Sequence, residues 1–281
     1  MKIGEIAQQG ERAQTVKQRD LIVRTASAAV LFAIALGATY VGDLPAGIVA
    51  AIFACFVQFE WALLTGGTIV RMAPFAAAVA IAIIISSAGM LVAAIAIAVV
   101  ATISAGVFAR DVWLPGGVVY ASVFGISLVA IRVSPDYGLA AVMFLLAIVW
   151  ATDSGAYFVG RIVGGAKLWP RISPKKTWAG VIGGLIGAVA AGIAVASIIE
   201  IPVTSDLIVV TVVLSVSCQA GDLYESWVKR RFGAKDSGSI IPGHGGVMDR
   251  VDGLVFAAAA AVTIGAGHAG LGELGRGLLI W

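Results

Sequence analysis

The sequence predicts an all-α, polytopic integral membrane protein with about nine transmembrane helices. The mean hydropathy is +1.00, and only 12% of the 281 residues are Asp, Glu, Lys or Arg. Charged residues make up about 25% of an average soluble domain, so this chain has too few to cover a water-exposed surface. Its apolar runs approach the roughly 20 residues that an α-helix needs to cross a bilayer.

The first 20 residues are polar and of mixed charge, which predicts a cytoplasmic segment, 1–20, and not a cleavable signal peptide. Nine apolar spans are expected near 21–41, 45–64, 73–86, 88–108, 117–132, 137–158, 178–199, 205–222 and 251–269. If the N-terminus is cytoplasmic, all of the 19 Lys and Arg residues except Arg132 and Arg276 fall on the inner side. The positive-inside rule therefore predicts a multi-pass protein of the cell (inner) membrane with a cytoplasmic N-terminus.

Two regions are expected along the chain. Residues 21–135 are apolar, with short connections, and are predicted to serve packing and dimerisation. Residues 136–281 contain two long cytoplasmic segments, 159–177 and 223–250, which are basic and rich in Gly, Pro, Ser and Asp. Functional chemistry is therefore expected in the second region, at the cytoplasmic face.

Three carboxylates fall within or at the end of apolar spans, where ionisable groups are costly. For Glu60, beside Trp61, a structural or interfacial role is preferred to a site role. Asp153, in "VWATDSGAYFVGR", has either a structural hydrogen-bonding role or a site role. Asp222 opens "GDLYESWVKRR", in which helical spacing places Asp222, Glu225, Ser226 and Lys229 on one face. Internal ion pairs on a solvated helix explain Glu225 and Lys229, but not Asp222.

The segment "MDRVDGLVF" places Asp249 and Asp252 at the start of the last span. One acidic residue there is an ordinary partner of the helix dipole. Two of them, at the same membrane level as Asp222, point to a divalent cation site, and Mg²⁺ prefers a few carboxylates with room for water and phosphate oxygens.

Basic and glycine-rich segments surround these carboxylates. Glycines in "RFGAKDSGSIIPGHGG" expose backbone N–H groups that suit an anion. In "ISPKKTW", Ser173 is expected to cap a helix that starts at Pro174. Lys175 and Lys176 would then lie in its first turn, where they oppose the helix dipole unless an anion binds there.

Metal-binding and phosphate-binding groups on one face are typical of phosphoryl or nucleotidyl transfer. The P-loop pattern GxxxxGK[ST] is absent, and the basic residues follow the membrane rule, so nucleic acid is not expected as a partner. A transporter is an alternative, but its site would lie near the midplane. Another membrane transferase is a second alternative, although the DGxxAR…GxxxD pattern of the CDP-alcohol phosphotransferases is absent.

The segment "SWVKRRFGAKDSGSIIPGHGGVMDRVD" resembles the motif of the phosphatidate cytidylyltransferases, or CDP-diacylglycerol synthases. The matching positions are Ser226, Lys229, Arg230, Lys235, Asp236, Gly238, Pro242, His244, Gly245, Gly246, Asp249, Arg250 and Asp252. The stretches "DSGAYFVGR" and "ISPKKTW" are also similar to that family. Ala179 is a departure, since many members carry Glu there.

The resemblance implies that CTP and phosphatidate react to give CDP-diacylglycerol and pyrophosphate. It also implies a homodimer in the bilayer and Mg²⁺ on residues matching Asp222 and Asp249, with room for K⁺ nearby. Asp222, Asp249, Lys229 and His244 are the expected catalytic residues, although His244 could instead only shape its turn. The expected substrate-binding residues are Asp153, Lys175, Lys176, Ser226, Arg230, Lys235, Asp236, Gly245, Gly246, Arg250 and Asp252.

Overall fold

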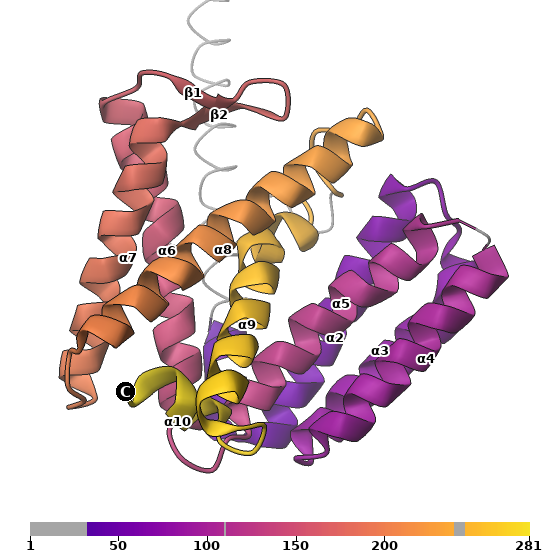
Figure 1. Cartoon of the computed structure of the whole chain (residues 1–281). Helices are drawn as coiled ribbons and strands as arrows, with labels where there is room; N and C mark the ends of the chain where they lie inside the picture. The colour runs from indigo at the N-terminus through magenta and orange to yellow at the C-terminus, as the bar shows by residue number, and fades with distance from the viewer. Residues whose placement is uncertain (1–32, 110, 239–244) are drawn as a thin grey trace, which may run out of the picture.

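The computed structural model describes residues 33–109, 111–238 and 245–281, which form a bundle of long helices (Figure 1). Eight of these helices are long and apolar enough to cross a membrane. They are α2 (Asp43–Leu64), α3 (Ile69–Ser87), α4 (Leu91–Ala109), α5 (Trp113–Arg132), α6 (Gly138–Ile162), α7 (Trp178–Ile198), α8 (Ser205–Arg231) and α9 (Met248–Ala269). Residues 33–41, at the end of the first predicted span, are also helical; the rest of that span lies outside the described residues.

The all-α prediction is confirmed, because eight of the nine expected spans correspond to these helices. The largest difference in length is at α8, which continues to Arg231 instead of ending near 222. Three basic residues in its last turn favour this extension through the helix dipole. A short helix that the hydropathy did not indicate, α10 (Leu274–Leu279), follows α9.

The expected helix start at Pro174 is wrong. Residues Ser173–Thr177 form strand β2, which pairs antiparallel with β1 (Lys167–Trp169). Helix α7 starts at Trp178, and its cap is Thr177, whose Oγ1 accepts a hydrogen bond from the Gly180 N–H at 3.1 Å. The strand keeps two lysines out of the first helical turn, where they would oppose the helix dipole.

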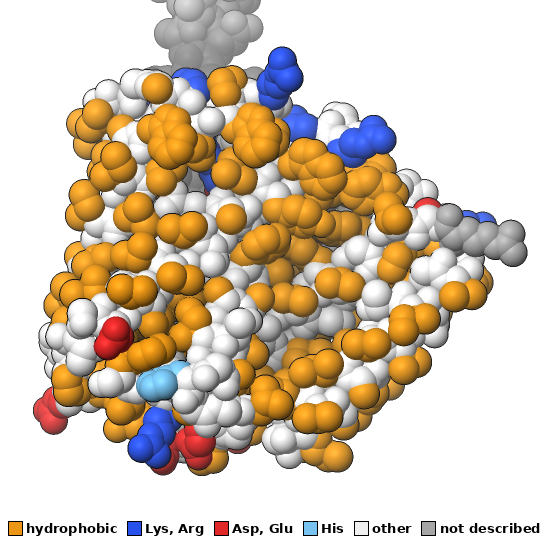
Figure 2. Space-filling view, in the orientation of Figure 1, with side chains coloured by type: hydrophobic (Ala, Val, Ile, Leu, Met, Phe, Trp, Pro, Cys, Tyr) orange, Lys and Arg blue, Asp and Glu red, His pale blue; other side chains and the backbone are white. Residues whose placement is uncertain are grey.

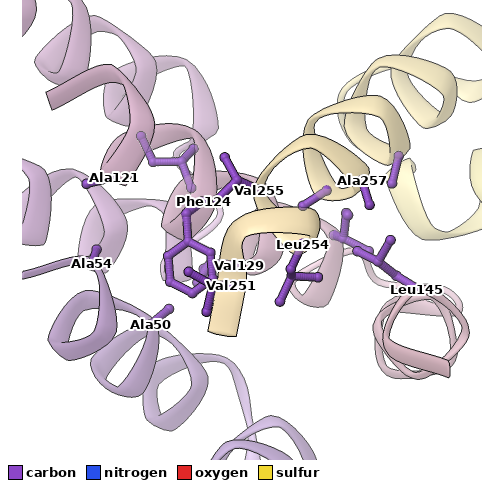
Figure 3. Close-up of a cluster of buried hydrophobic side chains, with 14 of the residues drawn as sticks. Ala50, Ala54, Ala121, Phe124, Val129, Leu145, Val251, Leu254, Val255 and Ala257 are labelled. Carbon is purple, nitrogen blue, oxygen red and sulfur yellow. The ribbon is translucent and has the colours of Figure 1, made fainter. Parts of the chain in front are cut away.

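Helix α9 lies in the middle of the bundle and packs against α2, α5 and α6. Figure 3 shows this contact, in which Leu254 and Val255 of α9 lie among Phe124, Leu145 and other buried apolar side chains. A helix held on several sides by close-packed neighbours is a rigid support for the side chains at its N-terminal end.

The two ends of the bundle differ in charge. One end is formed by the hairpin β1–β2, the C-terminal end of α8 and the N-terminal end of α9. Lys and Arg side chains gather there, at the top of Figure 2, and we call it the basic end. At the opposite end, Arg132 pairs with Asp43 at 2.7 Å, and its Nε donates to the backbone oxygen of Thr39. One of the two expected outer basic residues is thus held by an ion pair.

Candidate functional site

Three helices bring five acidic residues to the basic end. Asp153 comes from α6, Asp222 and Glu225 from α8, and Asp249 and Asp252 from α9. Electrostatic interactions connect Asp252 with Asp222 and Asp153, and Glu225 with Asp249. The structure thus places Asp252 near both Asp222 and Asp153, and Glu225 near Asp249, while a metal site on Asp222 and Asp249 stays a prediction.

Asp249 is the most tightly held of these carboxylates. Its Oδ1 lies 2.6 Å from Lys229 Nζ, and its Oδ2 accepts hydrogen bonds from the N–H groups of Gly246 (2.8 Å) and Ser237 (3.0 Å). The side chain is 9% exposed. Gly245 has a φ of +80°, and a Cβ there would lie 2.7 Å from Asp249 Oδ2, so this turn requires glycine.

Lys229 bridges two carboxylates, because its Nζ also lies 2.5 Å from Glu225 Oε2. The predicted pair of Glu225 and Lys229 on one helix face is therefore present. It is not on a solvated surface, however, since the Glu225 side chain is 0% exposed. Burial makes this pair part of the interior of the site, where breaking it by removing one partner is strongly unfavourable.

Asp222 has a different partner and more solvent. Its Oδ2 lies 2.5 Å from Lys176 Nζ, and its side chain is 32% exposed. Ser226 Oγ donates a long hydrogen bond of 3.4 Å to Asp222 Oδ1. Lys176 reaches it from strand β2, whereas its neighbour Lys175 is exposed. Because successive strand residues point to opposite faces, the two lysines cannot both face Asp222.

A cavity of about 370 Å³ extends from these carboxylates into the apolar interior of the bundle. Asp153, Asp249, Arg250 and Asp252 line one end of it. Side chains of α2, α5, α6 and α9, among them Phe53, Phe124 and Leu146, line its middle, and Arg132 lies at the far end. The cavity therefore joins a charged compartment to an apolar one.

The remaining predicted residues lie around this centre. The Arg230 guanidinium donates to the backbone oxygens of Ile172 (3.3 Å) and Ala234 (3.0 Å), which joins the hairpin to the end of α8. Lys235 and Asp236 are exposed in the loop after α8. His244, together with Pro242 and Gly243, lies outside the described residues.

Sequence reasoning missed two features of the site. The Tyr120 hydroxyl, on α5, is buried and has no hydrogen-bond partner within residues 33–109, 111–238 and 245–281, yet it interacts electrostatically with Asp252 and Glu225. Glu60 was expected to have a structural or interfacial role, and the structure shows a structural one, with the side chain buried against the start of α9; its partners there were not predicted. A carboxylate inside an apolar span was the signal for Glu60, whereas nothing distinguished Tyr120.

The described residues contain no group of three or more His, Cys, Asp or Glu side chains arranged to hold a metal ion by themselves. Mg²⁺ usually binds one or two protein carboxylates and completes its shell with water and phosphate oxygens. The carboxylates of Asp222 and Asp249 are therefore of the right chemical type to hold it. Five carboxylates face Lys176, Lys229 and Arg250, so the local charge favours an added cation.

The sequence model of the cytidylyltransferase family matches residues 22–266. A protein of Brucella suis biovar 1 (strain 1330) named phosphatidate cytidylyltransferase is 53% identical over 154 residues, which is 55% of this chain and 57% of the relative. A protein of the same name in Bacillus subtilis (strain 168) is 44% identical over 129 residues, 46% of this chain and 48% of the relative. The chain thus spans about half the length of the curated relatives it matches. Since the family model covers most of its length, the chain belongs to the cytidylyltransferase family.

Proposed function

We propose that this protein is a phosphatidate cytidylyltransferase, which transfers the cytidylyl group of CTP to phosphatidate. The observation that carries the proposal is the cavity that joins Asp153, Asp252 and the Lys229-paired Asp249 to an apolar interior. A soluble nucleotide and a membrane lipid need such a place to meet. The names of the relatives support the same reaction.

The lipid would bind with its phosphate at the level of Asp249 and Asp153 and part of an acyl chain in the apolar cavity. Phe53, Phe124 and Leu146 line this part of the cavity. CTP would arrive at the basic end, which we propose faces the cytoplasm because of its excess of Lys and Arg.

In the reaction, an ionised phosphate oxygen of phosphatidate attacks the α-phosphorus of CTP. A new P–O–P bond forms, the bond from the α-phosphorus to the oxygen that bridges it to the β-phosphorus breaks, and pyrophosphate leaves. The nucleophile is already an anion, so no strong base is needed, and the barrier comes from charge repulsion and positioning. Lys176 and Lys229, which lie beside Asp222 and Asp249, would contact the phosphates and reduce this repulsion.

Asp222 and Asp249 would hold Mg²⁺, with Asp252 as a supporting carboxylate nearby. The bound ion would supply positive charge to the phosphate oxygens and help to align the reacting groups. Lys229 lies between Asp249 and Glu225, so it keeps these carboxylates from repelling one another. A nearby K⁺ and a homodimer rest on the family resemblance and stay predictions.

The test is an assay of the purified protein with radiolabelled CTP and phosphatidate, with and without a chelator. We expect label in a lipid product that co-migrates with CDP-diacylglycerol, equimolar pyrophosphate, and loss of both with chelator. Diacylglycerol and polyprenol serve as control acceptors. Product only with one of these acceptors would assign another transferase, and lipid or nucleotide flux in liposomes without product would assign a transporter.

A further inference from the structure

Glu60 of α2 contacts the loop that leads into α9 with both of its carboxylate oxygens. Oε1 accepts a hydrogen bond from the Val247 N–H at 2.8 Å, and Oε2 accepts one from the Met248 N–H at 2.7 Å. Ser237 Oγ donates to Oε2 at 3.1 Å. The side chain is 0% exposed, and 187 residues separate Glu60 from Val247.

These hydrogen bonds replace a local helix cap. The N-cap of α9 is Val247, which has no side chain that could accept from the first N–H groups of the helix. Such N–H groups need partners when they are buried, and an anion at a helix start is favoured by the helix dipole. Glu60 therefore meets both needs from a distant helix, and its own burial is compensated by three donors.

The same carboxylate holds both ends of the loop. Ser237 lies at the beginning of the loop and Val247 and Met248 at its end, and all three donate to Glu60. A Cβ at Gly238 would lie 2.8 Å from Oε1, and a Cβ at Gly246 would overlap Oε2. Close backbone packing on one side chain fixes the distance between the two loop ends.

The two ends of this loop also supply the backbone N–H groups that donate to Asp249. Its carboxylate accepts from the N–H groups of Ser237 and Gly246, the residues that Glu60 contacts from the other side. Glu60 and Asp249 thus face each other across a single layer of backbone. Moving the Glu60 carboxylate would move the donors that orient Asp249.

We propose that Glu60 is a positioning residue, which sets the orientation of the Asp249 carboxylate through Ser237 and the 245–248 turn. The proposal rests on the proposed function for the role of Asp249 in catalysis. It makes α2, in the region expected to serve only packing and dimerisation, a necessary part of the site.

The test compares Glu60→Gln with Gln58→Met, a matched change of another fully buried polar side chain on α2. Gln58 donates a hydrogen bond to Met72 Sδ, and among the described residues it has none to Ser237, Val247 or Met248. In Glu60→Gln an amide NH₂ faces an N–H or O–H donor, so one loop end is released. We expect kcat and the affinity for Mn²⁺, measured by electron paramagnetic resonance, each to fall about 10- to 100-fold, the range typical of residues that orient metal ligands. Gln58→Met should change neither.

A double-mutant cycle with Ser237→Ala identifies the route of the effect. Ser237→Ala should lower kcat in the wild type and cause a smaller loss in Glu60→Gln, because the Ser237–Glu60 hydrogen bond is one of the three contacts through which Glu60 acts. Full additivity would overturn the proposal. If Glu60→Gln fails to fold, Ser237→Ala alone decides: unchanged kcat and Mn²⁺ affinity would overturn the proposal, and a loss of both would support it.

The outcomes separate this inference from the proposed function. A wild type that binds Mn²⁺ but makes no CDP-diacylglycerol would overturn the proposed function, while the Mn²⁺ affinity of Glu60→Gln would still decide the role of Glu60. An active wild type with an equally active, equally Mn²⁺-binding Glu60→Gln would overturn the positioning role alone. Equal losses in Glu60→Gln and Gln58→Met would also overturn it, since they would indicate general destabilisation.

Discussion

The surroundings of Asp249 and Asp222 differ although each carboxylate pairs with one lysine. Asp249 is 9% exposed and has two backbone donors besides Lys229. Asp222 is 32% exposed and, among the described residues, has only a long hydrogen bond from Ser226 besides Lys176. One carboxylate is fixed by the fold and the other is free to adjust. This division suits a site in which a fixed group orients the reaction and an adjustable one admits a large soluble substrate.

The largest effect is expected at the fixed carboxylate. Asp249→Asn places an amide NH₂ against Lys229 or a backbone N–H and should reduce kcat on the order of 10³-fold, a loss typical of a group that stabilises the transition state. The measurement is labelled CDP-diacylglycerol formed per folded protein. Wild-type turnover by this variant would refute the assigned role.

At Asp222, the adjustable carboxylate, we expect a clear loss of catalysis with little change in stability. Asp222→Asn should lower kcat about 10²-fold. Its thermal midpoint should match the wild type, because a partly exposed ion pair contributes only about 0–1 kcal/mol to stability. Asp206→Asn, at the opposite end of the same helix, is the control and should behave as the wild type. A large drop in the midpoint for Asp222→Asn would show that its surroundings are as fixed as those of Asp249.

The strand β2 gives a third comparison. Lys176→Met should raise the KM for CTP about tenfold, which corresponds to about 1.4 kcal/mol of binding free energy. Lys175→Met should have a smaller effect because Lys175 is exposed, and Lys167→Met, on the neighbouring strand, should have none. Steady-state kinetics with varied CTP checks this order. Equal effects at Lys175 and Lys176 would favour the helical arrangement that the structure replaces with a strand.

The smallest change is expected for Tyr120→Phe. Removing a buried hydroxyl that has no hydrogen-bond partner among the described residues should leave stability unchanged or raise it by about 1 kcal/mol. We expect the hydroxyl to fill space only, so kcat should change less than twofold. A loss of activity with unchanged stability would show that Tyr120 contacts a substrate. Thermal unfolding and turnover measured on one preparation separate the two results.

The helices could be predicted because hydropathy alone determines which segments cross a bilayer, and the acidic cluster because buried charges in spans are costly. The hairpin could not be predicted, because "SPKK" has the signature of a helix start. The strand that forms there instead depends on pairing with Lys167–Trp169. The partners of Glu60 could not be predicted either. Backbone N–H groups carry no sequence pattern, and 187 residues lie between donor and acceptor.

The contact of Glu60 with the start of α9 also has a consequence for biogenesis. Helix α2 is synthesised well before α9, which is the last in chain order of the eight long helices described above. The nascent chain therefore lacks the backbone donors of Glu60 while the earlier spans are inserted, and it acquires them only when α9 enters the bilayer. Chains truncated before α9 lack this partner, so they lack both an organised site and the hydrogen bonds that would make burial of Glu60 tolerable.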